Sequence, residues 1–389
     1  MSCYISTKQN RFYVAIENRY GQVAPIAEAT RVPAVRLVAR QELERIERRD
    51  KIGGRTFGGI PSGVRRRTSF ELTTYLTEWR AGAPAPGYRP LFLGAFGGGS
   101  RSFAGGVVSS LSGTQLRTGS AHGLIPGQAV ACGGEIRFVT AVVDAQTVQL
   151  NAPFTGPAGA GTPIERTMTF LPGGALPSVS IFDYWSPGSA VHRILAGAAV
   201  DRLRVNINAD FHEFTFSGAA QDLLDSASFE SGQGELEEFP QEPPLAPDSH
   251  GVVPGNLGQA WLGSSPERFL TVTEAEVVLD NNLDVRAREF GSMGPRCIVA
   301  GERYVSASFS LYEKPDEATK SLYQAARQRS PISVMFQLGI QPGQLCGVYL
   351  KSVIPEVPEF MDDETRLEWR FRDCRAQGWI DDEIYLAFA

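Results

Sequence analysis

Residues 274–288 read EAEVVLDNNLDVRAR, and polar and apolar side chains alternate along most of this stretch. The even-numbered positions are polar apart from Val278, and most of their charges are acidic. The odd-numbered positions are apolar apart from Asn281. Successive side chains of a β-strand point to opposite faces of the sheet, so a period of two is typical of a strand with one wet face. The stretch therefore predicts one long strand, mainly acidic on one face and apolar on the other.

A second alternating stretch covers residues 35–48. Its two faces carry Val35, Leu37, Ala39 and Leu43 on one side and Arg36, Arg40, Glu42 and Glu44 on the other. A charged helix is the alternative here, because the sequence QELERIERR is rich in strong helix formers. The likeness to residues 274–288 favours the strand.

Each of these strands precedes a glycine-rich loop and a second alternating strand. The loops are residues 51–63 and 290–301, and the strands are residues 64–79 and 303–313. A helix is predicted over residues 316–328, which have an acidic first turn and a basic last turn.

Three further pairs of apolar stretches follow in the same order in the two halves of the chain. They are residues 179–185 and 332–338, residues 195–207 and 345–357, and residues 211–218 and 367–373. A shared order of this kind is typical of an internal repeat. The fold class that we predict is mainly β, with two duplicated domains that each carry a short helix.

Two segments interrupt the repeat. Three short strands with tight turns, near residues 121–130, 135–143 and 147–154, predict a small β-module inserted into a loop of the first domain. A second segment is rich in Glu and Pro and predicts an extended acidic linker. The expected organisation is a first domain over residues 1–228, the module over residues 103–170, the linker over residues 229–258 and a second domain over residues 259–389.

Composition excludes several classes of protein. The net charge of −6 argues against a basic clamp for nucleic acid. The five cysteines are scattered without a C-x-x-C pair, which favours reduced thiols over disulfides or a zinc site. The N-terminus lacks the apolar core of a signal peptide, and no apolar run is long enough to span a bilayer. We therefore expect a chain made in a cytoplasm and not inserted in a membrane.

Catalytic signatures are missing from the sequence. His122, His192, His212 and His250 show no metal-ligand spacing, and no nucleophile elbow or phosphate-binding loop occurs. The acidic clusters at residues 362–364 and 381–383 are best interpreted as solvated turns, although a hard cation is the alternative. We predict a structural protein with no catalytic, cofactor-binding or metal site, and not an enzyme. Five Trp residues leave a carbohydrate-binding β-protein as an alternative of a different class.

The duplicated pattern resembles the tail tube proteins of long-tailed bacteriophages, in the form that carries two tube domains in one polypeptide. The resemblance rests on residues 35–48, 53–63 and 64–79 and on their equivalents, residues 274–288, 290–301 and 303–313. It covers most of the chain, but the inserted module departs from the family pattern. A tail terminator, a baseplate hub or an adaptor ring protein of the same fold is the alternative.

The resemblance implies that each domain contributes a four-stranded sheet to one β-barrel around a channel. Single-domain subunits form hexameric rings, so a two-domain subunit is expected to form a homotrimer, and the rings stack head to tail. The polar strand faces would line the channel and let DNA pass during ejection, because acidic side chains repel phosphates. The candidate lumen-lining residues are Glu42, Glu44, Glu274, Glu276, Asp280 and Asp284.

Arg65, Arg66 and Arg67 could form a basic patch for nucleic acid, but alternation places Arg66 opposite its neighbours. This favours ion pairs between rings or between subunits as their role. The partners that the resemblance implies are further copies of the chain and the tape measure, baseplate and terminator proteins of the tail. Genomic DNA would pass through the lumen without specific binding. The expected location is the tail of the virion.

Overall fold

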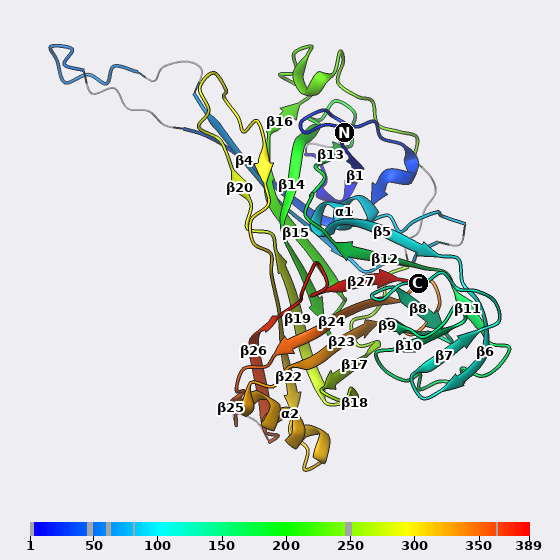
Figure 1. Ribbon diagram of the computed structural model, residues 1–389. Coiled ribbons are helices and arrows are strands. Elements are labelled where there is room, and N and C mark those ends of the chain that lie inside the picture. Colours follow the sequence, from blue (N-terminus) through cyan, green and yellow to red (C-terminus); the bar gives the residue numbers. More distant parts are fainter. Residues whose placement is uncertain (1–3, 45–49, 60–63, 81, 246–250, 363–364) are drawn as a thin grey trace.

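The computed structural model describes residues 4–44, 50–59, 64–80, 82–245, 251–362 and 365–389. The fold is mainly β with two short α-helices in the described part of the chain, which confirms the predicted class. Residues 45–48 of the first alternating stretch, residues 60–63 of its loop, Cys3 and His250 lie outside the described residues. Figure 1 shows a long sheet that runs the length of the molecule, with a compact barrel on one side of it.

The first half of the chain contains two layers of strands around α1. Its elements are β1 (Asn10–Ile16), β2 (Arg31–Val32), β3 (Ala34–Leu43), β4 (Arg66–Tyr75), α1 (Arg89–Phe96), β13 (Val179–Trp185), β14 (Arg193–Ile207), β15 (Glu213–Ala220) and β16 (Asp222–Asp225). Short 3-10 turns at Thr7–Gln9 and Glu28–Thr30 precede β1 and β2. The strand predicted over residues 35–48 is confirmed by β3, so the helical alternative is wrong over the described part of that stretch.

The second half repeats this order. Its elements are β17 (Gly258–Gly263), β18 (Glu267–Phe269), β19 (Val272–Asp280), β20 (Asp284–Val285), β21 (Ile298–Val299), β22 (Tyr304–Tyr312), α2 (Glu317–Gln328), β23 (Ile332–Leu338), β24 (Cys346–Ile354), β25 (Glu359–Met361), β26 (Glu368–Ala376) and β27 (Tyr385–Phe388). The predicted helix is confirmed by α2, whose N-cap Asp316 accepts a hydrogen bond from the backbone of Thr319 at 2.9 Å.

Strand pairing follows the same plan in both halves. The pairs β1–β13, β3–β4, β4–β15, β14–β15 and β14–β16 correspond to β17–β23, β19–β22, β22–β26, β24–β26 and β24–β27. The halves are joined where β14 pairs with β19, from Arg202 opposite Asp280 to Ile207 opposite Ala275. The strands β3, β4, β15, β14, β19, β22, β26 and β25 therefore lie side by side in this order, and we call this run the long sheet.

The strand predicted over residues 274–288 is shorter than expected. The β19 strand ends at Asp280, because the buried side chain of Asn281 donates hydrogen bonds to the carbonyls of Ala95 and Val200, both at 3.0 Å. Asn282 then adopts a positive φ of 47°, a left-handed conformation that ends the strand. Alternation alone could not reveal this turn, since Asn281 occupies an inward-facing position of the pattern.

Aromatic side chains fill the centre of the core. Phe92 of α1 has ring centroids 5.2 Å away in Phe170, Phe214, Phe216 and Phe388. Phe388 comes from the end of the second half, so the C-terminal strand completes the core around the first helix. Burying one large apolar side chain contributes about 1.5–3 kcal/mol, and this shared cluster therefore couples the two halves.

The inserted module has more strands than predicted. Its elements are β5 (Gly97–Phe103), β6 (Gly106–Ser112), β7 (Gln115–Thr118), β8 (Ala129–Cys132), β9 (Glu135–Val142), β10 (Thr147–Leu150), β11 (Pro163–Glu165) and β12 (Thr167–Pro172). Strands β6 to β11 close a six-stranded barrel, whereas the sequence predicted three strands. The missed strands β6, β7 and β11 are rich in Ser, Gln and Thr or very short, so they lack an apolar alternation.

The barrel packs on the second half of the chain. Arg137 is fully buried there, and its guanidinium donates to Gln337 and Gln259, both at 3.1 Å. The same group pairs with Glu135 and lies over the Trp261 ring at 4.9 Å. The module inserted in the first half thus packs against and stabilises the second half.

The acidic segment before β17 is extended but not detached. A short turn at Gln233–Glu235 is its one helical piece in the described residues. Leu236 and Phe239 pack against a cluster of the first half that contains Tyr13 and Tyr184. Although burial raises the pKa of Glu242, hydrogen bonds from Arg11 and Tyr13 hold it below its usual value. Two apolar residues among many acidic ones were too weak a signal to predict this anchoring.

Candidate functional site

One face of the long sheet is mostly polar along its whole width, with Val38 and Val278 among its members, and the other face packs on the core. A row across the strands runs from Glu71 to Ser217, Arg202, Asp280 and Tyr304, each paired with the next. A parallel row runs through Thr73, Thr215, Arg204, Val278, Ser306 and Arg375. We call this surface the polar face. It crosses the junction of the two halves without interruption.

The carboxylates singled out in the sequence occupy this face or its upper border. Glu42 lies on β3, and Glu274, Glu276 and Asp280 lie on β19. Glu44 follows β3 and pairs with Arg65 at 3.7 Å, and Asp284 begins β20 and pairs with Arg286 at 3.2 Å. Four of the six residues are therefore brought together on one continuous surface, and the other two lie beyond its strand ends.

Arginines match most of these carboxylates. Glu42 pairs with Arg40 at 2.9 Å, Glu276 pairs with Arg204 at 3.0 Å, and Asp280 accepts from Arg202 at 2.9 Å. Further pairs on the same face join Arg36 to Glu71, Arg370 to Glu368 and Arg372 to Glu359. Exposed pairs of this kind contribute roughly 0–1 kcal/mol each, so their main effect is on charge. The face is a mosaic of both signs.

The arginines of β14 and β26 were missed as members of this surface. Arg202 and Arg204 alternate with the buried Leu203 and Val205, and the same spacing recurs in β26. This period-two pattern is present in the sequence and was a usable signal.

The three arginines at the start of β4 make contacts within the chain. Arg66 pairs with Asp222 at 3.2 Å, and its backbone N–H donates to the carbonyl of Met293 at 2.6 Å. Arg67 lies opposite Glu42 in the register of β3 and β4. These arginines line a cavity of about 320 Å³ together with Ala287 and Arg288. Their role between subunits stays a prediction.

The two end strands of the long sheet have one neighbour each in the described part of the chain. β3 pairs with β4 alone, and β25 pairs with β26 alone. Val35 and Val38 of β3 and Phe360 of β25 are exposed apolar side chains on these edges. An uncovered strand edge presents unpaired backbone donors and acceptors to another chain. The long sheet therefore has two open edges for strand addition.

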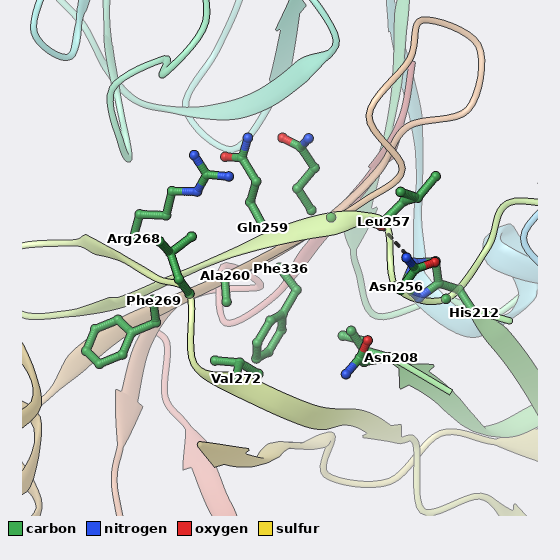
Figure 2. A pocket seen from close by; sticks show the side chains of 15 residues that line it. Asn208, His212, Asn256, Leu257, Gln259, Ala260, Arg268, Phe269, Val272 and Phe336 are labelled. Atoms are coloured by element: carbon green, nitrogen blue, oxygen red, sulfur yellow. Dashed lines mark hydrogen bonds between the residues drawn. The ribbon is translucent and has the colours of Figure 1, made fainter. Parts of the chain in front are cut away.

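The cavity in Figure 2 lies where the chain passes from the first half to β17. It measures about 180 Å³, and Asn208, His212, Asn256 and Arg268 are among its lining residues. The Nε2 atom of the buried His212 donates to the carbonyl of Leu257 at 3.0 Å. Burial lowers the pKa of His212, which favours the neutral ring. This arrangement fixes the connection between the halves.

Groups suited to metal binding are not clustered in the described part of the chain. Three carboxylates of the acidic turn at residues 381–383 are engaged by cations of the protein: Asp381 and Glu383 by Arg303, and Asp382 by Lys351. The four described cysteines are free thiols, and burial raises the pKa of Cys132 and Cys374 to about 11. Such thiols are poor nucleophiles.

Trp residues do not form a shared stacking platform. Trp79, Trp261 and Trp369 are buried in the cores, and Trp379 alone among the five is strongly exposed. No described helix has the length and apolar character that a bilayer crossing requires.

A duplicated sheet with one polar face and two open edges is the architecture of a structural β-protein that works through its surface. The comparison with protein families agrees with this class: the family described as "Phage tail tube protein" matches residues 7–364. The chain belongs to that family, which is a structural one and makes it a component of the virion tail. A search of curated proteins found no match.

Proposed function

We propose that this chain is a tube subunit that acts by assembly, and that three copies form a ring whose long sheets close into one barrel around a channel. The observation that carries the proposal is the β14–β19 pairing. It joins the last strand of the first half's sheet to the first strand of the second half's sheet. The strands in the equivalent outer positions are β25, with the end of β24, and β3.

The same pairing between copies would join β25 of one subunit to β3 of the next. Such a contact is heterologous, because different edges meet. It gives a closed ring when a whole number of subunit-to-subunit rotations makes a full turn. Closure removes both open edges, which are otherwise sites of aggregation. Three copies supply six sheet units, the number that the resemblance to single-domain tube proteins implies.

The polar face is the surface proposed to line the channel, since the opposite face is occupied by the core and both helices. Glu42, Glu276 and Asp280 would stand in the lumen beside their arginine partners. Phosphate contacts dominate non-specific binding of DNA, and arginines already paired with carboxylates bind phosphate less well. Genomic DNA would then slide past without being retained.

Stacked rings would make the tube, and other tail proteins such as the tape measure, baseplate and terminator proteins would contact it. Synthesis in the host cytoplasm is part of the same proposal, and no cofactor is required. A ring that never stacks would instead favour a tail terminator, baseplate hub or adaptor ring of the same fold.

Electron microscopy and light scattering of the purified full chain test the proposal. We expect trimers at low concentration and hollow tubes at high concentration; compact monomers at every concentration would overturn it. A matched pair of variants tests the edges. Leu37→Lys places a charge on the inward side of β3, where a neighbouring strand would bury it, so it should abolish ring formation. Val38→Lys, on the polar face of the same strand, should leave rings intact.

A further inference from the structure

The loop between β19 and β22 leaves the second half and lies on the first. Its Met293 carbonyl accepts the backbone N–H of Arg66 at 2.6 Å, at the start of β4. Gly294 approaches the turn between β15 and β16 so closely that a Cβ there would stand 2.9 Å from the Gln221 carbonyl oxygen. The second sheet unit thus carries a loop that covers strand ends of the first unit.

The corresponding position in the second half is uncovered. There the turn after β26 spans residues 377–384, whereas Gln221 alone connects β15 to β16. Trp379 is 89% exposed and Ile380 is 74% exposed at the tip of this turn. A cavity of about 530 Å³ lies beside them, between Val305, Ile354 and Trp379 among other residues.

The turn is held in place although its apolar tip is exposed. The backbone N–H of Trp379 donates to the Asp382 carboxylate at 2.7 Å, and Arg303 bonds Asp381 at 3.0 Å and Glu383 at 2.6 Å. A fixed, exposed Trp loses little conformational freedom on binding, which is the property of an interface anchor.

The loop between β3 and β4 is the equivalent of the loop that covers the first half. Residues 50–59 lie at the far end of a hairpin that projects from the body of the molecule in Figure 1. Ile52 and Phe57 are exposed apolar side chains of this segment, and Lys51 and Arg55 are exposed beside them. The exposed carboxylates of Asp381 and Glu302 border the opposite turn but are paired with Arg303 and Arg375, so apolar character is the main match between the two segments.

We propose that residues 50–59 of one copy dock on Trp379 and Ile380 of the next copy in the same ring. The proposal rests on the ring proposed above and adds to it a second contact for each subunit pair. It repeats between copies the contact that Met293 and Gly294 of the second half make with the first half within one chain. Aromatic and aliphatic side chains from Phe57 and Ile52 would cover the Trp379 ring and fill the neighbouring cavity.

Disulfide trapping between two differently marked chains tests this contact. The background carries Cys3→Ser and Cys297→Ser, since the other three cysteines are buried. One chain adds Phe57→Cys and the other adds Trp379→Cys. We expect a crosslinked pair of chains under mild oxidation of the mixture only, and neither chain should crosslink alone. Assembly is followed in parallel by electron microscopy, and rings that form without any crosslink overturn the docking but leave the ring itself standing. Failure to assemble at all overturns both.

A substitution series gives a second measurement. Trp379→Ala should raise the concentration needed for assembly by roughly tenfold, as expected for an interface anchor. Leu270→Ala, which removes another strongly exposed apolar side chain of the second half, should leave that concentration unchanged.

Trp379 is the most exposed of the five Trp residues, so assembly should shift Trp emission to shorter wavelength in the parent chain but not in Trp379→Phe. Equal behaviour of Trp379→Ala and Leu270→Ala would overturn the proposal.

Discussion

β3 and β19 occupy the same place in the two halves, but among the described residues only β19 has a neighbouring strand on both sides. Val277 and Leu279 of β19 are each 1% exposed, because β14 covers one side and β22 the other. Leu37 and Ala39 of β3 are half-buried, with β4 as their one partner strand. The difference is one neighbouring strand. The first half supplies β14 as a neighbour to β19 of the second half, and in the proposed ring another copy would supply the missing neighbour of β3.

The same truncation in the two strands should have very different costs. Leu279→Ala removes a fully buried side chain, so we expect a loss of about 2–5 kcal/mol in the free energy of unfolding. Leu37→Ala should cost roughly 1 kcal/mol or less in the isolated chain, because part of that side chain is already hydrated. Urea unfolding of the two variants measures both. Equal losses would show that β3 is as fully covered as β19, contrary to the comparison.

The turn after β19 has no counterpart after β3 in the described residues. Asn281→Ala removes two hydrogen bonds and leaves the carbonyls of Ala95 and Val200 buried without this donor. We expect a loss of about 1–3 kcal/mol in unfolding free energy. Asn282→Gly, at the adjacent positive φ, is the control and should cost less, since glycine adopts that conformation readily and the one side-chain hydrogen bond removed, to the Glu302 carbonyl, is exposed to solvent. An Asn281→Ala variant as stable as the parent would show that the turn does not fix the end of β19.

Sequence patterning predicted the duplicated strands because polar and apolar side chains alternate along most of each. It located β13 and β23 at the residues where the structure has them, since both are continuous apolar runs between polar turns. It did not reveal the end of β19 at Asn281 or the strands β6 and β7, where tertiary hydrogen bonds and barrel closure override a weak local pattern. The ion pairs between the two halves, such as Arg204 with Glu276, escaped prediction for another reason, because such cross-strand neighbours are set by a pairing between distant segments.

The contact of His212 with the connection between the halves should make stability depend on pH. The pKa of His212 is lowered by burial, so the unfolded chain binds a proton more readily than the folded chain does. The contribution of neutral His212 is then fully present above the ordinary His pKa of about 6.5 and is lost as the pH falls below it. We expect the unfolding free energy to decline as the pH falls through that range, with the slope that corresponds to at most one proton bound on unfolding. His212→Gln should flatten this part of the profile, and an unchanged slope would exclude His212 as its source.

The smallest effect on stability is expected on the polar face. Glu276→Gln breaks an exposed pair with Arg204, and such pairs contribute roughly 0–1 kcal/mol. Its effect on the channel should be larger, because Arg204 would then face the lumen without a carboxylate partner at this position. Assembled Glu276→Gln should retain more double-stranded DNA than the parent at low salt, and the excess should disappear as salt rises, since phosphate contacts release counterions. The control variant Glu317→Gln breaks a more exposed pair with Lys320 on α2, away from the polar face, and should leave DNA retention unchanged. Equal retention by both variants would mean that the polar face does not line the path of DNA, while the strand comparison would still stand.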